Sequence, residues 1–276
     1  MEMAKTKLLI ITHEMSPFLE LTKISEITRQ LPQAMQEKGF EIRILMPRFG
    51  NINERRNRLH EVIRLSGMNI VIGETDNPLI IKVASIPSAR MQVYFLDNED
   101  FFHRKHVFTD AKGKFYPDND DRAIFFCKGA LETVKKLGWA PDVVHCHGWM
   151  SSLVPAYLKT SYKDDPTFKD AKIVYSIYNT SFTSSLGANF AQKALIKGME
   201  TKDTINYAEG THQTMNKAAI AYSDAIVIGD DSVDEDVLNF VKKSEKPVLA
   251  YDSTLDLDNY YNFYQEIASD ELISVA

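Results

Sequence analysis

The chain has 276 residues, of which 44% are hydrophobic and 25% are charged. These proportions are typical of a soluble globular protein with a sizeable buried core, so they exclude extensive disorder. The 38 Asp and Glu residues outnumber the 32 Lys and Arg residues, which gives a net charge of −6. Because nucleic-acid binding needs a basic surface field, this balance argues against nucleic acid as a partner.

Cysteine content and the amino-terminal segment indicate the cellular compartment. The two cysteines, Cys127 and Cys146, form no CxxC motif, which favours a reducing environment over a secreted disulfide scaffold. The first apolar run, 8–11, is too short for a signal-peptide core. No apolar stretch is long enough to cross a bilayer. We therefore expect a cytoplasmic protein without a membrane partner.

The pattern of glycines bears on nucleotide cofactors. There are 12 glycines, and no two of them are adjacent or spaced as GxG. The glycine-rich loops that cradle phosphates in dinucleotide-binding and P-loop proteins need such spacing. The sequence therefore gives no support for a bound nucleotide cofactor, and we expect no cofactor.

In chain order, the first predicted element is a buried strand over 7–12, followed by a helix over 24–38 whose apolar residues recur at helical spacing. A strand through Ile42, Ile44 and Met46 completes a βαβ unit of a parallel sheet. Short alternating runs then predict an antiparallel β insertion. These runs cover 60–65, 68–72, 79–85 and 92–96.

An amphipathic helix is predicted over 118–137, and strands and helices then alternate to the end of the chain. Strands are expected at 143–146, 173–177, 225–228 and 248–251, and helices at 150–159, before Tyr222, at 233–242 and at 256–268. The last helix carries Leu257, Tyr260, Tyr264 and Ile267 on one face. We predict one doubly wound, Rossmann-like α/β domain over 1–276 with a β insertion.

In such sheets ligands bind beyond the carboxyl ends of the strands, so the loops after Thr12, Cys146, Ile177 and Ile228 are the places to look for chemistry. His145 and His147 are two residues apart, so both point to one side of a strand. They are either a ligand-facing pair or structural histidines. No further ligand at a suitable spacing indicates a metal, and we expect none.

Two acidic segments allow a structural explanation. The segment from Tyr116 to Arg122 either begins a helix, where acids satisfy free N–H groups, or presents polar groups to a sugar or a cation. The segment from Asp230 to Asp236 lacks the central glycine and terminal glutamate of a calcium loop. We interpret it as an acidic helix start.

Short motifs in a fixed order resemble bacterial glycogen and starch synthases, a family of GT-B glycosyltransferases. The resemblance covers about 7–228. The motifs are Glu14-Met-Ser-Pro-Phe18, Met46-Pro-Arg-Phe-Gly50, Tyr94-Phe-Leu-Asp-Asn98, Tyr116-Pro-Asp-Asn-Asp-Asp-Arg122 and Pro141-Asp-Val-Val-His-Cys-His-Gly-Trp149.

The resemblance implies a fold of two Rossmann-like domains that face a cleft, and this chain resembles only the first. Members of the family transfer glucose from ADP-glucose to the end of an α-1,4-glucan and hold the donor mainly with the second domain. Residues 229–276 are too few to form that domain. We expect them to supply a strand and a helix that close the first one.

Departures from the family pattern concern the donor loop. Where family enzymes have Lys-Thr-Gly-Gly-Leu, this chain has Glu20-Leu-Thr-Lys-Ile24, so Glu20 replaces the phosphate-binding lysine and Thr22 and Lys23 replace the glycines. The family's His-Asp-Trp becomes His147-Gly-Trp149, and its later His-Asn becomes Tyr178-Asn179.

The family's other site residues are retained. The resemblance implies a catalytic role for His147 and a substrate-binding role for Tyr116, Asp118, Asn119, Arg122, Trp149 and Asn179. We therefore expect a stand-alone synthase-like domain, degenerate for donor binding, that binds an α-glucan, a maltooligosaccharide or a partner protein. The alternative is a working glucosyltransferase subunit completed by a separate donor-binding chain.

Overall fold

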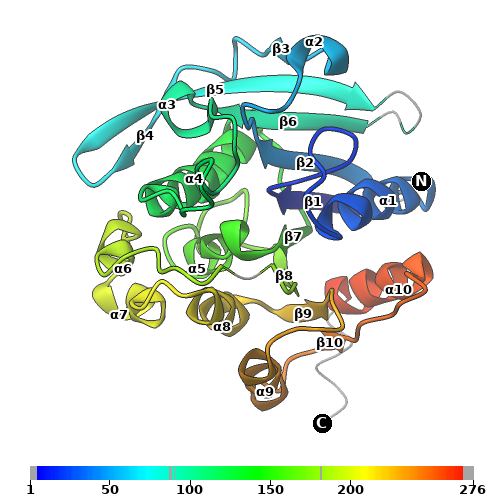
Figure 1. Ribbon diagram of the computed structural model, residues 1–276. Coiled ribbons are helices and arrows are strands. Elements are labelled where there is room, and N and C mark those ends of the chain that lie inside the picture. Colours follow the sequence, from blue (N-terminus) through cyan, green and yellow to red (C-terminus); the bar gives the residue numbers. More distant parts are fainter. Residues whose placement is uncertain (1–4, 87–88, 90, 181, 270–276) are drawn as a thin grey trace.

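A mixed β-sheet runs through the middle of the computed structural model, which describes residues 5–86, 89, 91–180 and 182–269 (Figure 1). Seven of its strands are parallel, and β1 lies between β7 and β2. In spatial order they are β10 (Val248–Leu249), β9 (Ala225–Ile228), β8 (Lys172–Ile177), β7 (Val143–His147), β1 (Lys7–Thr12), β2 (Glu41–Pro47) and β6 (Met91–Asp97). The predicted α/β class with a doubly wound sheet is confirmed.

The antiparallel part is smaller than the sequence pattern predicts. It consists of β5 (Thr75–Ile86), which pairs with β6, and of β3 (His60–Glu61) and β4 (Met68–Ile72), which pair with β5. The predicted run at 92–96 belongs instead to the parallel sheet, because β6 pairs with β2 through Ile44 and Val93. Nearly all of β6 is buried on both faces, as expected for a strand covered by helices on both sides.

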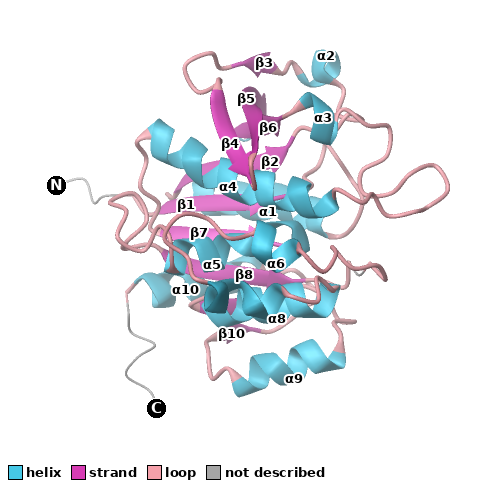
Figure 2. Ribbon diagram, turned by 90° about the vertical axis from the view of Figure 1, so that its left-hand side faces the viewer, coloured by secondary structure: helices cyan, strands magenta, loops and turns pink. Residues whose placement is uncertain are grey.

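Helices cover both faces of the sheet (Figures 1 and 2). On one face, α4 (Asn119–Leu137), α5 (Leu153–Lys159), α8 (His212–Tyr222) and α9 (Glu235–Lys243) pack in succession. On the other face, α1 (Ile24–Glu37) packs beside α10 (Leu257–Ala268). Short helices α2 (Glu54–Asn57), α3 (Glu99–Phe102), α6 (Phe190–Lys193) and α7 (Thr201–Thr204) lie in the connections. Among the described residues, no helix has the length and apolar character needed to cross a membrane.

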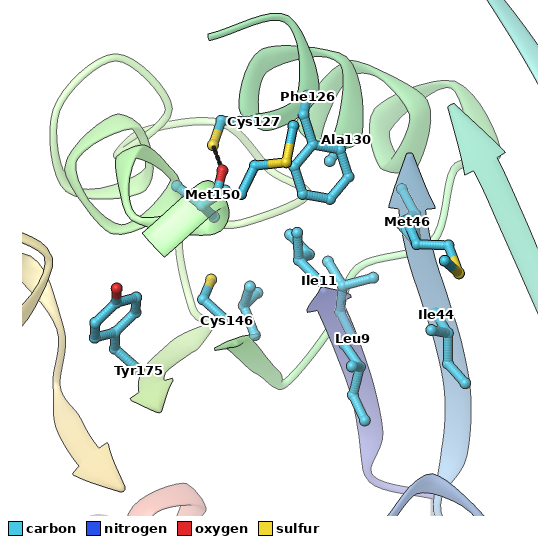
Figure 3. Packing of buried hydrophobic residues seen from close by; sticks show 14 of the residues in the cluster. Leu9, Ile11, Ile44, Met46, Phe126, Cys127, Ala130, Cys146, Met150 and Tyr175 are labelled. Atoms are coloured by element: carbon cyan, nitrogen blue, oxygen red, sulfur yellow. Dashed lines mark hydrogen bonds between the residues drawn. The ribbon is translucent and has the colours of Figure 1, made fainter. Parts of the chain in front are cut away.

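The side chains of β1 are apolar on both faces of the strand, because helices cover both faces of the sheet. Leu9 and Ile11 point toward Phe126 and Ala130 of α4 (Figure 3). Because successive residues of a strand face opposite sides, the buried Leu8 and Ile10 belong to the other face. Each fully buried aliphatic side chain of this kind stabilises the fold by about 1.5–3 kcal/mol.

Both cysteines are free and buried in this core. The Cys127 thiol donates to the carbonyl of Met150 at 3.1 Å (Figure 3). Burial raises the pKa of the Cys127 thiol to about 12 and also raises that of Cys146. Because the thiolate is the reactive form, both side chains are packing groups and not nucleophiles.

The carboxyl-terminal helix α10 packs against the amino-terminal half of the chain. Its buried face consists of Tyr260, Phe263, Tyr264 and Ile267. The predicted stripe missed Phe263 and included Leu257, which is only half-buried because it lies in the first turn. The Tyr264 hydroxyl forms a 2.6 Å hydrogen bond with Nδ1 of His145, so α10 is tied to the central strand β7.

Replacing Tyr264 with Ala should lower the free energy of unfolding by about 3 kcal/mol, because a buried aromatic side chain leaves a cavity and His145 loses a partner. Chemical denaturation measures the loss, and Asn262→Ala on the exposed face of α10 is the matched control.

A chain ending at Asp252 should aggregate or fold poorly. A truncated chain that is monomeric and equally heat-stable would show that α10 is a dispensable appendage.

Candidate functional site

The loops that follow β1, β7 and β8 meet at the carboxyl edge of the sheet and enclose a pocket of about 470 Å³. A further wall comes from the loop between α3 and α4. We name this site the aromatic pocket, and its wall includes His13, Thr22, Phe108, Phe115, Trp149, Asn179, Thr180 and Phe182. The edge of the sheet where it opens is the one that the strand order predicts for ligands.

Aromatic side chains form most of the pocket wall. Trp149 lies with its ring centroid 5.0 Å from Phe108 and 4.9 Å from Phe182. Phe115 stacks on Phe182 with centroids 4.9 Å apart and an interplanar angle of 17°. The three phenylalanines are only half-buried. The rings therefore offer apolar surface to a ligand while they brace one another.

Polar groups without partners lie among these rings. In the described structure, Nδ1 of His13 and Oγ1 of Thr180 are buried and make no hydrogen bond. Burial lowers the pKa of His13 to about 4, so its neutral imidazole has one donor and one acceptor nitrogen. Such groups can bond a ligand hydroxyl, because a hydroxyl both donates and accepts.

Gly148 allows the His13 ring to approach the start of the loop after β7. It has a φ of +73°, and a Cβ there would lie 3.1 Å from Cε1 of His13. A side chain at this position would therefore crowd the imidazole, so the close approach of His13 to this loop depends on Gly148.

The sequence analysis named Trp149 and Asn179 as substrate-binding residues and Thr22 as part of the donor loop, and all three lie on this wall. It did not name His13 or the three phenylalanines. His13 directly follows the first strand, in a loop that the sequence analysis singled out, so that signal was available. Phe108, Phe115 and Phe182 lie in irregular segments where no periodicity marks a side chain as facing a pocket.

His145 and His147 point to the same side of β7, as their spacing predicts, and their ring centroids are 4.0 Å apart. Both are fully buried, and neither belongs to the pocket wall. Nδ1 of His147 forms a 2.8 Å hydrogen bond with the Tyr178 hydroxyl, while its Nε2 has no partner in the described structure. Burial lowers the pKa of His147 to about 3, so this histidine is neutral.

Four of the predicted substrate-binding residues hold the loop 103–118 instead of lining the aromatic pocket. Asp118 pairs with Arg104, whose Nη1 lies 2.8 Å from its Oδ1. The Arg104 guanidinium also stacks 4.7 Å from the Tyr116 ring. Nδ2 of Asn119 donates to the carbonyl of Phe108 at 2.8 Å. This loop carries Phe108 and Phe115, so these contacts fix one wall of the pocket.

Arg122 is the buried centre of the loop contacts. Its side chain has no solvent exposure, and its Nη1 donates to Oδ1 of Asn119. The guanidinium lies within cation–π distance of four rings, 5.6 Å from Phe49, Phe102 and Tyr116 and 6.0 Å from Phe108. Burial lowers the pKa of Arg122 to about 10, which still leaves it charged at neutral pH.

The remaining predicted site residues lie at the start of α1, where carboxylates gather. The buried Glu14 accepts from the backbone N–H groups of Leu21 and Thr22 at 2.6 and 2.9 Å and from the Thr22 hydroxyl. The Ser16 hydroxyl donates to Glu20 at 2.6 Å. Anions normally favour the amino-terminal end of a helix. Here the protein's own carboxylates lie around that end.

Lys23 is the lysine of the donor loop, but it is already engaged with carboxylates. Its Nζ lies 3.5 Å from Asp230 and 3.6 Å from Asp231. The attraction of Asp230 is the main reason that the pKa of Lys23 is raised. The side-chain amide of Asn179, in the loop after β8, donates to the Ser232 hydroxyl at 3.2 Å.

Lowering the pH should destabilise the protein through its buried histidines. The pKa values of His13 and His147 are about 4 and 3 in the folded state, against 6.5 in an unfolded chain. The unfolded chain therefore binds more protons, and stability that is present above pH 6.5 is lost as the pH falls. Each histidine contributes up to about 1.4 kcal/mol per pH unit.

Denaturation at pH 7, 6 and 5 measures this slope. His147→Gln should make the slope shallower, whereas His60→Gln, at an exposed position, should leave it unchanged. A free energy of unfolding that stays constant between pH 7 and pH 5 would contradict the prediction.

Comparison with known proteins identifies relatives for most of the chain. Residues 7–248 match a family model described as the starch synthase catalytic domain. A glycogen synthase of Chlorobium luteolum is 44% identical over 174 residues, which are 63% of this chain and 36% of the relative. A glycogen synthase of Chlorobaculum tepidum is 36% identical over 226 residues, or 82% of this chain and 46% of the relative. The chain thus spans less than half of the length of these relatives.

A solved structure shows the same fold. The catalytic domain of starch synthase IV from Arabidopsis thaliana, bound to ADP and acarbose, superposes with a TM-score of 0.71 at 19% identity. The match covers 90% of this chain and 51% of the plant chain.

Proposed function

The chain belongs to the starch synthase catalytic domain family, and we propose that it binds an α-1,4-glucan segment in the aromatic pocket without transferring glucose by itself. The observation that carries this proposal is the wall of Phe108, Phe115, Trp149 and Phe182 with the unpartnered His13 nitrogen among them. Glucose rings have apolar faces and a rim of hydroxyls. An aromatic wall with isolated polar groups suits both features.

The charges around the start of α1 support the proposal that this chain does not bind a sugar-nucleotide donor by itself. A nucleoside diphosphate would approach the carboxylates of Glu20, Asp230 and Asp231. Lys23, which lies beside them, already pairs with the two aspartates. Stabilising a departing diphosphate requires positive or hydrogen-bonding groups aimed at it. The Arabidopsis relative was solved with ADP and acarbose, so both kinds of ligand can be tested on this chain.

A second candidate is a glucosyltransferase subunit completed by a separate donor-binding chain. It rests on the relatives, which are named glycogen synthases, and on the retained His147 and Trp149. This candidate requires that ADP-glucose bind to the pair of chains. The two proposals therefore differ in whether a donor-binding partner chain, added to this protein, produces binding of ADP-glucose and transfer of glucose.

Replacing Phe182 with Ala should weaken maltoheptaose binding by about tenfold, or about 1.4 kcal/mol, because the stacked pair with Phe115 is lost. Isothermal titration calorimetry measures the affinity. The control is Tyr261→Ala, which removes another half-buried ring, on α10. Unchanged affinity in Phe182→Ala, or equal loss in both variants, would move the glucan site elsewhere.

The isolated protein should show no micromolar affinity for ADP or ADP-glucose, because the carboxylates at the α1 start repel phosphate. The same calorimeter and buffer serve for this titration, with maltoheptaose as the positive comparison. Micromolar binding of either nucleotide to the isolated protein would overturn the proposal.

A further inference from the structure

A smaller pocket, of about 240 Å³, opens beyond the carboxyl ends of β9 and β10, between the first turns of α1 and α10. We name it the tyrosine pocket, because three tyrosines and three acidic residues contribute to its wall. These are Tyr178, Tyr251, Tyr260, Glu26, Asp252 and Asp256. The tyrosine pocket shares no lining residue with the aromatic pocket, so it is a separate site.

The ring of Tyr178 is a fixed part of this wall. The residue is buried, and its hydroxyl forms a 2.8 Å hydrogen bond with Nδ1 of His147. A Cβ at Gly229 would lie 2.3 Å from Cε1 of Tyr178. Because ring and backbone touch there, any side chain at position 229 would displace the ring. The wall is therefore organised before a ligand arrives, which lowers the cost of binding.

Tyr260 brings an unused hydroxyl to the pocket. The residue is only 8% exposed, and within the described part of the chain its hydroxyl makes no hydrogen bond. Burial and the negative charge of Asp252 raise the pKa of Tyr260 to about 12, so the hydroxyl is protonated and lies near Asp252. A buried hydroxyl without a partner costs free energy. The arrangement points to a polar ligand group.

The three carboxylates of the wall have only neutral partners. Among the described residues, Glu26, Asp252 and Asp256 form no ion pair with a lysine or arginine. Asp252 accepts from the N–H and the hydroxyl of Thr254 at 2.8 and 2.7 Å, and Asp256 accepts from a backbone N–H of α10 at 2.9 Å. Glu26 accepts from the side-chain amide of Gln30 at 2.9 Å. These hydrogen bonds leave the negative charges uncompensated.

Two lysines near the pocket are paired with other carboxylates. Lys23, the lysine of the wall, has its ammonium nitrogen 3.5 Å from Asp230 and 3.6 Å from Asp231. Lys38 pairs with Asp258 at 2.6 Å and acts on one pocket carboxylate only through space. Three carboxylates against one lysine that already faces two others leave the pocket with an excess of negative charge. Such a pocket attracts cations.

One ammonium group already lies against this wall. The Nζ atom of Lys23 is 5.5 Å from the centroid of the Tyr251 ring. A cation at this distance is attracted by the electron-rich face of an aromatic ring. The contact shows that a ring of the tyrosine pocket accepts an ammonium group, while the hydroxyl of Tyr260 stays unused.

We propose that the tyrosine pocket binds the ammonium group of a small aliphatic amine. An ammonium group has only donors, which match the Tyr260 oxygen and the carboxylate oxygens. The alkyl chain can pack on Ile27 and Leu249 of the same lining. The pocket has about half the volume of the aromatic pocket, which suits a slender chain better than a sugar ring. This proposal does not depend on glucan binding.

Titration of the full chain with 1,4-diaminobutane at pH 7, followed by calorimetry, tests the proposal. We expect saturable binding at millimolar concentration and none of 1,4-butanediol, the neutral analogue of equal length. Tyr260→Phe should weaken the binding by about tenfold, because a charge-assisted hydrogen bond is lost. Its hydroxyl bonds to no protein group, so this variant should fold normally. Tyr261→Phe, the same change at the next position of α10, is the matched control.

Charge variants report the sign of the site independently of Tyr260. Lys23→Gln should strengthen the binding by about threefold, because a like charge beside the ligand is removed, and Glu26→Gln should weaken it by a similar factor. Glu37→Gln, at another exposed glutamate of α1, is the matched control.

Absence of saturable diamine binding, or equal binding of the diol, would overturn the proposal. Weaker binding in Lys23→Gln would also overturn it, since the pocket would then hold an anion. Equal effects of the two tyrosine variants, or of the two glutamate variants, would contradict it as well, because they would reflect only the general attraction of an acidic protein for amines.

Discussion

Parallel pairing of β1 with β2 on one side and β7 on the other determines where every other feature of the molecule lies. The pairing is strong because the side chains of β1 are buried on both faces. Its register places Thr12 opposite His147, so the residues that follow, His13 and Gly148, meet at the carboxyl edge. The aromatic pocket is built around that meeting point.

A chain of buried polar side chains connects this edge to the carboxyl-terminal helix. Tyr264 of α10 bonds to Nδ1 of His145, and Nε2 of His145 bonds to the Ser176 hydroxyl at 2.7 Å. The His145 ring lies against the His147 ring with centroids 4.0 Å apart and a tilt of 35°, and His147 bonds to the Tyr178 hydroxyl. Because burial keeps both histidines neutral, their hydrogen bonds carry no charge and need no counter-ion. Helix α10 therefore stabilises the strand that ends at the pocket.

One buried cation organises loop 103–118, which forms one wall of the aromatic pocket. Arg122 contacts rings from the segment after β2, from α3 and from loop 103–118, so it links three parts of the chain at once. The same loop contributes Phe108 and Phe115 to the aromatic pocket. A buried guanidinium is costly unless it is compensated, and here the ring faces, Asn119 and the nearby Asp118 supply the compensation.

The sequence by itself determined the class of the fold, most of its elements and the family. The apolar periods of 7–12, 24–38 and 256–268 are local properties, and the edge of the sheet where ligands bind follows from strand order. Only the tertiary structure decided which side chains reach a pocket. Arg122 and Asn119 carry the polar chemistry of a binding site, yet packing buries them under loop 103–118. His13 and Phe182 belong to irregular segments, and their positions depend on contacts between residues far apart in the chain, which no local pattern encodes.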